Sequence, residues 1–170
     1  MLFRSRTAFE RALTVASDQA RRELREHALC FIDLDRFKAV NDNAGHAGGD
    51  ALLQQIGHAI RHSCRAQDFA ARIGGDEFAL LLADCSLVGA RKAAQQVVDA
   101  IAGVRFIWHG KSYEVGASVG ITLVSARSPH LTELMSQADA ACYAAKNAGR
   151  NRVAVYDPTQ HGPERLAQIA

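Results

Sequence analysis

The chain has 170 residues, of which 48% are hydrophobic, and this length and composition suit one compact domain with its own core. Lysine and arginine number 20 against 18 aspartate and glutamate residues, so the net charge of +2 is too small to indicate a protein that coats a nucleic acid. The N-terminal segment is charged throughout, and no apolar run approaches the roughly 20 residues of a membrane span. We therefore expect a cytoplasmic domain that contacts neither nucleic acid nor membrane.

The cysteines, Cys30, Cys64, Cys85 and Cys142, are dispersed along the chain. They form no C-x-x-C pair and have no histidine partner at zinc-finger spacing, so the sequence predicts neither a zinc site nor a disulfide framework. We expect reduced, buried thiols.

Hydrophobic periodicity predicts strands and helices in a mixed order. In chain order it predicts a helix over 7–25, a strand over 27–34, a helix over 48–64, strands over 68–73 and 77–82, a helix over 89–103, a hairpin over 105–115, a strand over 117–124, a helix over 131–149 and a strand over 152–156. This mixture indicates an α/β sandwich, in which helices cover a mixed central sheet of about five strands. We assign residues 1–158 to the domain and 159–170 to a tail.

Two glycines, Gly74 and Gly75, stand directly before Asp76 and Glu77, between two predicted strands. Glycine tolerates a positive φ, so we predict a tight hairpin between antiparallel strands. The turn would then present two adjacent carboxylates at one end of the sheet.

A second acidic pair, Asp33 and Asp35, ends the first predicted strand. Neighbouring side chains along a strand point to opposite faces, so we expect only Asp33, with the Leu34 carbonyl, to converge on the hairpin acids. Oxygen ligands of this kind suit Mg²⁺, which binds through one or two carboxylates together with substrate phosphates. The alternative is that each acid only forms a turn, because aspartate is common at strand ends and beside glycine.

The sequence resembles the GGDEF domain of bacterial diguanylate cyclases. The pentapeptide itself stands at 74–78, and "FIDLDRFKAVNDNAGHAGGDALL", "ARIGGDEFALLL", "ASVGITL" and "ADAACYAAKNAGRNRV" follow the family's motifs in order, over about residues 9–156. The resemblance implies a fold like the palm of polymerases and nucleotide cyclases. It also implies that two facing subunits, each holding one GTP, form cyclic di-GMP and release pyrophosphate.

The resemblance assigns Mg²⁺ or Mn²⁺ to Asp33, the Leu34 carbonyl and Asp76. It leaves Glu77 either as a further ligand or as the group that helps to deprotonate the 3′-hydroxyl. This chemistry is reasonable, because attack of a hydroxyl on an α-phosphate needs a more acidic nucleophile and a neutralised pyrophosphate leaving group.

The resemblance also assigns the substrate-binding residues. The turn glycines Gly74 and Gly75 are among them. Triphosphate contacts would come from the backbone amides of Arg36 and Phe37 and from the side chains of Lys38, Lys146 and Arg150. Cationic side chains suit a triphosphate. On the residues alone, the alternative is a solvated basic face, and "KNAGR" is also an ordinary helix C-terminus that a glycine ends.

Guanine selection is assigned in the family to Asn41 and Asp50. An aspartate carboxylate can accept from the guanine N1 and N2 donors, and an asparagine amide can pair with the remaining edge. Adenine would leave the carboxylate badly paired. The alternative is a turn asparagine and an aspartate at a helix start.

Residues 65–68, "RAQD", match the family's R-x-x-D motif, which implies an inhibitory site for cyclic di-GMP. Arg65 can stack on a guanine and bind its O6 and N7, and Asp68 can accept from N1 and N2. The alternative is an ion pair on a helix surface at i, i+3. Where many relatives add a second arginine, this chain has Gln95 and Gln96.

The segment that opens these domains, "DxLTGLxNR", is only partly present, with Arg6 kept and Ser5 in place of the asparagine. We therefore expect a module that pairs with a second copy and that belongs with an upstream sensor or dimerisation element. The sequence favours an active cyclase. Its alternatives are a receptor that binds cyclic di-GMP or GTP without turnover and, more distantly, a cyclase that makes a cyclic mononucleotide.

Overall fold

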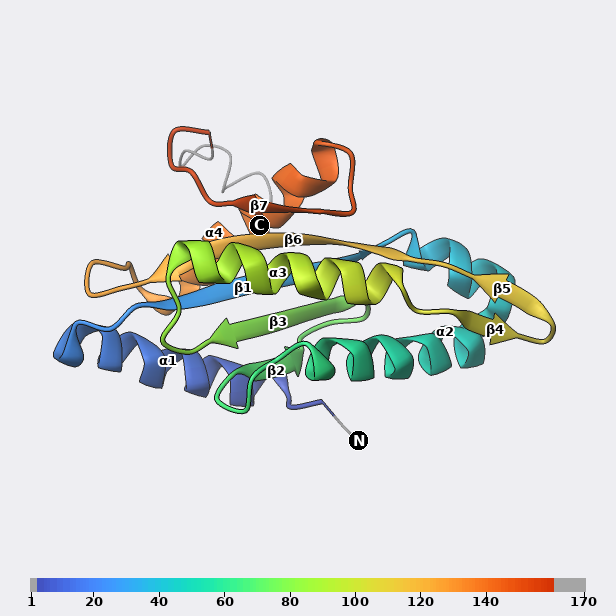
Figure 1. Ribbon diagram of the computed structural model, residues 1–170, viewed down its shortest axis with the longest axis horizontal. Helices are drawn as coiled ribbons and strands as arrows, with labels where there is room; N and C mark the ends of the chain where they lie inside the picture. The colour runs from blue at the N-terminus through green and yellow to red at the C-terminus, as the bar shows by residue number, and fades with distance from the viewer. Residues whose placement is uncertain (1–2, 161–170) are drawn as a thin grey trace.

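Four helices and seven strands make up residues 3–160, the part of the chain that the computed structural model describes (Figure 1). They are α1 (Arg6–Glu23), β1 (His27–Asp35), α2 (Phe37–His62), β2 (Phe69–Arg72), β3 (Glu77–Leu82), α3 (Leu87–Ala102), β4 (Phe106–Trp108), β5 (Lys111–Tyr113), β6 (Gly116–Val124), α4 (Leu131–Asn147) and β7 (Arg152–Val155). Every predicted element is present. The predicted tail lies outside the described residues from position 161 onward.

The central sheet has the strand order β2-β3-β1-β6-β7. Its middle strand β1 pairs antiparallel with both β3 and β6, β2 pairs antiparallel with β3, and β7 pairs parallel with β6. Strands β4 and β5 form a separate antiparallel hairpin. The predicted mixed sheet of five strands and its small hairpin are therefore confirmed.

Two apolar layers hold helices against the two faces of this sheet. Leu29 and Phe31 of β1 pack in one layer with α1 and α4, whereas Ala28 and Ile32 pack in the other with α2 and α3. Because side chains alternate along a strand, odd-numbered residues of β1 lie on the α1/α4 face and even-numbered residues on the α2/α3 face. This parity decides which helices can contribute to a site at the end of β1.

Helix α2 begins eleven residues before the helix that the sequence predicts at 48–64, and it bends at Gly45, where φ is 74°. Its first part, 37–44, buries only Phe37 and Val40, and two apolar positions are too few to predict a helix from periodicity. A Cβ on Gly49 would lie 1.8 Å from the Asn41 Oδ1. The absence of this side chain lets the two parts of α2 pack closely and brings Asn41 beside Asp50.

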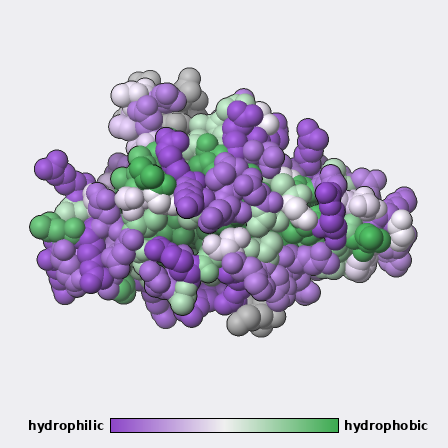
Figure 2. Space-filling view, viewed as in Figure 1, coloured by the Kyte–Doolittle hydropathy of each residue, from purple (hydrophilic) through white to green (hydrophobic). Residues whose placement is uncertain are grey.

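The surface on the α3 side is mainly hydrophilic, with apolar residues scattered among polar ones (Figure 2). Within residues 3–160, no helix is both long enough and apolar enough to span a membrane. All four cysteines are free thiols, and Cys64 is the one that is partly exposed.

The end of β1 that lies farthest from the acids begins with a buried histidine. His27 is 1% exposed, its Nδ1 accepts a hydrogen bond from the Asp84 backbone N–H at 3.0 Å, and its Nε2 has no partner among the described residues. Burial lowers the pKa of His27, against a raising effect of Asp84; Arg25 lowers it further and Glu23 raises it. In the pH range between this lowered pKa and the ordinary histidine pKa, folded His27 is therefore neutral, whereas an exposed histidine binds a proton.

We expect the free energy of unfolding to fall as the pH drops from about 6.5, the ordinary histidine pKa, toward the lower pKa of folded His27. In that window the unfolded chain binds a proton that the folded chain does not. Denaturant unfolding at several pH values measures the slope. His27→Asn, which keeps an acceptor near Nδ1 but does not titrate, should flatten it, and exposed His46→Asn should not. An unchanged slope in His27→Asn would assign the pH dependence to other groups.

Candidate active site

The acids that the sequence singles out meet where β1 and β3 lie side by side. Asp33 of β1 stands directly opposite Glu77 of β3 in the antiparallel register, and the Leu34 backbone N–H donates to the Asp76 carbonyl at 3.2 Å. Directly opposite residues share a face of the sheet, so the Asp33 and Glu77 carboxylates are both on the α1/α4 face. Three predicted acids and the Leu34 backbone thus converge at one sheet end.

The turn that carries Asp76 is a hairpin, as expected, but the reason given for its glycines is wrong. Positive φ values occur among described glycines only at Gly45, Gly110 and Gly149, so neither turn glycine needs a left-handed backbone. Space is the constraint instead. A Cβ on Gly74 would lie 2.8 Å from the Glu77 Oε2, whereas Gly75 has no heavy atom within 4 Å of that position. Gly74 therefore makes room for the Glu77 carboxylate, and Gly75 leaves the tip of the turn open.

Asp35 stays out of the acidic cluster for a different reason from the expected one. Asp33 and Asp35 are two residues apart, so alternation puts them on the same face. The Asp35 carboxylate is buried and fully used: it accepts from Ser118 Oγ at 2.7 Å and from the Asn151 N–H at 2.8 Å. Asp35 therefore joins β1 to β6 and to the segment after α4.

Helix α4 supplies a cation to the acids. The Lys146 Nζ lies 2.9 Å from the Asp33 Oδ2, and both side chains are about three-quarters buried, with 26% and 22% exposed. The Asp33 Oδ1 is buried without a hydrogen-bond partner among the described residues. Burial raises the pKa of Asp33 although the Lys146 ammonium lowers it; burial lowers the pKa of Lys146, but its hydrogen bond to Asp33 raises it above its ordinary value.

Glu77 lies in a strongly negative environment. Burial raises its pKa, and the nearby charges of Asp33, Asp139 and Asp76 raise it further, while Arg6 lowers it. Burial likewise raises the pKa of Asp139, a residue of α4 that the sequence reasoning missed. The signal was present: Asp139 precedes Lys146 by seven residues, two turns of helix, so the two share a helix face.

Two segments with positive φ values lie near this end of β1: the residue before α2 and the residues after α4. Arg36, the N-cap of α2, has φ 62°, and no side chain caps the first N–H groups of this helix. Arg150 and Asn151 have φ of 61° and 47°. Arg36 and Arg150 line one open cavity of about 320 Å³, so these two predicted phosphate-binding residues are brought together. Lys38 is exposed on the first turn of α2.

The two predicted guanine-binding residues lie on the other side of the sheet. Asp50 lines a cavity of about 530 Å³ with Phe3, Leu53, Arg72 and Phe78. Asn41 is adjacent through Gly49. Because Leu53 and Phe78 belong to the α2/α3 layer, this cavity opens on the face opposite to Asp33. A nucleotide that contacts both groups must pass around the end of the sheet that the hairpin turn forms.

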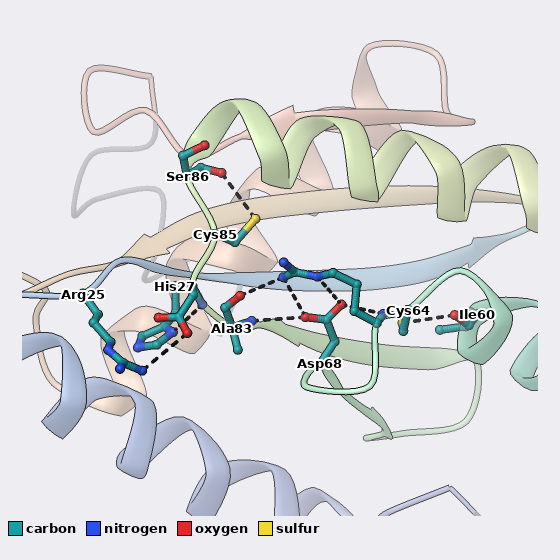
Figure 3. Close-up of polar contacts among 10 residues, drawn as sticks. Arg25, His27, Ile60, Cys64, Asp68, Ala83, Cys85 and Ser86 are labelled. Atoms are coloured by element: carbon teal, nitrogen blue, oxygen red, sulfur yellow. Dashed lines mark hydrogen bonds and ion pairs between the residues drawn. The ribbon is translucent and has the colours of Figure 1, made fainter.

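The R-x-x-D pair is not on a helix surface but in the turn between α2 and β2 (Figure 3). The Asp68 side chain is 2% exposed, and its two oxygens accept from the Arg65 backbone N–H, the Arg65 guanidinium and the Ala83 N–H at 2.9–3.2 Å. The same guanidinium donates to the Ala83 carbonyl at 2.7 Å. Since Ala83 follows β3 and Glu77 begins it, the pair is roughly 20 Å from the acids.

The family model of the diguanylate cyclase GGDEF domain matches residues 3–152. The chain belongs to this family. It is 50% identical over 156 residues to the probable diguanylate cyclase DgcE of Escherichia coli strain K12, covering 92% of this chain and 14% of DgcE. It is 36% identical over 166 residues to diguanylate cyclase TpbB of Pseudomonas aeruginosa, covering 97% of this chain and 36% of TpbB. The chain therefore spans a minor part of each relative.

Solved GGDEF domains have the same fold. The crystal structure of the TpbB GGDEF domain matches with a TM-score of 0.86 at 34% identity, over 91% of this chain and 97% of that domain. The GGDEF domain of DgcB from Caulobacter crescentus, solved in complex with c-di-GMP, matches with a TM-score of 0.85 at 27% identity, over 91% of both chains. The predicted palm-like GGDEF fold is confirmed.

The acids have the chemistry to hold a divalent metal. Within residues 3–160, no three His, Cys, Asp or Glu side chains form a preformed metal cluster. However, the unpartnered Asp33 Oδ1 and the nearby Asp76 and Glu77 carboxylates are hard oxygen ligands. Mg²⁺ is commonly held by one or two carboxylates plus substrate phosphates rather than by a complete protein cage. The residues present therefore suit a GGDEF domain whose metal is completed by a triphosphate.

Proposed function

We propose that this GGDEF domain is a diguanylate cyclase that joins two molecules of GTP into cyclic di-GMP and releases pyrophosphate. The observation that carries the proposal is the convergence of Asp33, Asp76 and Glu77 at one sheet end, with Lys146 directly on Asp33. The 50% identity to DgcE supports it.

Asp33, the Leu34 carbonyl, Asp76 and Glu77 would hold Mg²⁺ or Mn²⁺. A bound divalent ion makes the attacking hydroxyl more acidic and neutralises the triphosphate. Without a metal, burial and the charges of Asp33, Asp139 and Asp76 raise the pKa of Glu77, and a bound cation would oppose this effect. Glu77 would serve either as a ligand or as the group that helps to deprotonate the 3′-hydroxyl.

The triphosphate would lie against the uncapped start of α2, where the Arg36 and Phe37 N–H groups are available, and between Lys146 and Arg150. Lys38 adds a cation on the first turn of the helix. Lys146 would move from Asp33 to the phosphates as the charge on the acids is neutralised. The open tip at Gly75 allows the nucleotide to approach the turn backbone.

The base would occupy the cavity on the α2/α3 face, where Asp50 accepts from guanine N1 and N2 and Asn41 pairs with the remaining edge. One set of acids serves one GTP, whereas a cyclic dinucleotide requires two phosphoryl transfers. The reaction therefore needs two domains that face each other, which makes a homodimer the active form.

We also propose that cyclic di-GMP binds at Arg65 and inhibits. Arg65 is half exposed, with 48% of its side chain accessible, so its guanidinium can stack on a guanine. The solved DgcB domain in complex with c-di-GMP supports binding of this product by the family. Both Asp68 oxygens are occupied without ligand, so a guanine can reach this carboxylate only in exchange for its bonds to Arg65 and Ala83.

We expect the purified protein to convert GTP, with Mg²⁺ or Mn²⁺, into cyclic di-GMP, at a rate that rises more than linearly with protein concentration. Asp33→Ala, Asp76→Ala and Glu77→Ala should each lower turnover by about 100-fold or more, because each removes charge stabilisation at the reacting phosphate. Chromatography of the nucleotides measures turnover, and circular dichroism checks the fold.

Asp18→Ala, on the exposed side of α1, is the matched control and should keep the parent rate. If a dimer forced by an N-terminal coiled coil still forms no product, the domain is not a cyclase and acts as a nucleotide receptor. Unchanged turnover in one acid variant would remove that residue from the site.

Nucleotide selection gives a separate expectation. GTP should bind more tightly than ATP, and Asp50→Ala should reduce this preference by about 1–3 kcal/mol, the cost of one unpaired buried polar group. Calorimetric titration with both nucleotides measures the preference, and exposed Asp42→Ala of the same helix should leave it intact. Equal affinities in the parent protein would exclude the guanine assignment.

In the proposed inhibitory site, substitutions of Arg65 and of Asp68 should have different effects. Arg65→Ala should abolish cyclic di-GMP binding and leave GTP affinity unchanged. Asp68→Ala should also lower the free energy of unfolding by about 1–3 kcal/mol, because the Ala83 N–H loses its acceptor. Titration and denaturant unfolding measure the two effects, with Arg11→Ala as the control. Parent-like product affinity in the double variant Arg65→Ala, Asp68→Ala would place the product elsewhere.

A further inference from the structure

One arginine connects the two halves of the candidate site. Arg72 ends β2, directly opposite Phe78 of β3, so its side chain starts on the α2/α3 face. Its Nε donates to the Gly74 carbonyl at 3.2 Å and to the Gly75 carbonyl at 2.9 Å. The side chain therefore crosses the hairpin turn and holds both of its glycine peptides.

The same side chain reaches the cavity that contains Asp50. Arg72 lines the 530 Å³ cavity together with Asp50 and Arg61. Its Nη atoms make no hydrogen bond, and the guanidinium forms no ion pair with a carboxylate, among residues 3–160. Arg72 thus touches both the backbone of the acidic turn and the wall of the cavity that contains Asp50.

We infer that Arg72 is a positioning residue, which fixes the Gly74–Asp76 turn so that the Asp76 and Glu77 carboxylates are aimed at the reacting phosphate. The physical need is clear from the turn itself. Its glycines have no side chains to pack, and Gly75 has no neighbour within 4 Å of its Cβ position. Glycine has the largest backbone entropy to lose on ordering, so a side chain that binds the turn carbonyls adds to the order that the backbone hydrogen bonds supply.

A guanidinium suits this task. One Nε–H lies between two carbonyls in a three-centre arrangement, and the fixed plane of the group sets the angle between them. Its positive charge also offsets the partial negative charge of both carbonyls, which would otherwise repel a triphosphate at the tip of the turn. The inference rests on the proposed cyclase function, but the geometry of the turn can be tested without nucleotide.

The test compares Arg72→Gln with Arg61→Gln, which removes a charge from the same cavity without touching the turn. In the nucleotide-free protein, hydrogen exchange is measured at the Leu34 and Ile73 N–H groups, which donate to the Asp76 and Glu77 carbonyls. Their protection should fall about 10-fold or more in Arg72→Gln, and amides of β6 should keep theirs. Arg61→Gln should change neither set, and Arg72→Lys should restore part of the protection.

In the cyclase assay, Arg72→Gln should lower kcat by about 10- to 100-fold and change KM for GTP by less than about threefold, because misplaced acids affect the transition state more than substrate binding. Unchanged protection of Leu34 and Ile73 would overturn the inference. So would an equal loss of protection throughout β6, which would mean global destabilisation. If the parent protein forms no cyclic di-GMP, the proposed function fails, and the exchange result still decides the role of Arg72.

Discussion

The pairing of β1 with β3 is the constraint on which the candidate site depends. It places Asp33 opposite Glu77 and lets the Leu34 N–H hold the Asp76 carbonyl. A slip of one residue would turn Glu77 to the opposite face, because side chains alternate along a strand. Such a slip would also exchange the apolar residues of β3 between two different layers, both of which are buried. Core packing therefore fixes the position of the acids, and the acids need contribute nothing to the register.

The register of β1 and β3 also explains why the candidate site is divided between the two faces of the sheet. Asp33 and Glu77 lie on the sheet face that α4 covers, and α4 provides Lys146, whereas α2 carries Asp50 on the opposite face. A helix can serve only the face that it covers, so neither helix could supply both groups. The hairpin turn at the sheet end is the element that borders both faces. Its backbone therefore connects the two parts of the candidate site.

Most of this arrangement can be predicted from the sequence, because strong periodicity marks the core elements and the acids stand at their ends. Two physical reasons behind these predictions were wrong. Neither Gly74 nor Gly75 has the positive φ expected of the turn, and hydrogen bonds rather than strand alternation keep Asp35 out of the acidic cluster. The helix over 37–44 was missed because it buries few residues. The spacing of Asp139 from Lys146 puts the two on one helix face, but its proximity to Glu77 depends on segments far apart in the sequence. Arg72 was missed because it contacts backbone carbonyls, which have no sequence signature.

Hydrogen-bond satisfaction separates Asp35 and Asp68 from Asp33, the buried acid of the candidate site. The side chains of Asp35 and Asp68 are both almost fully buried, and each of their oxygens accepts at least one hydrogen bond, so each closes a junction between segments. Asp33 is also largely buried, yet its Oδ1 has no partner among the described residues. A buried carboxylate oxygen without a donor costs free energy that the fold has not recovered. A cation that reaches this oxygen recovers that free energy on binding, which is why this aspartate, rather than the two satisfied ones, suits the role of a metal ligand.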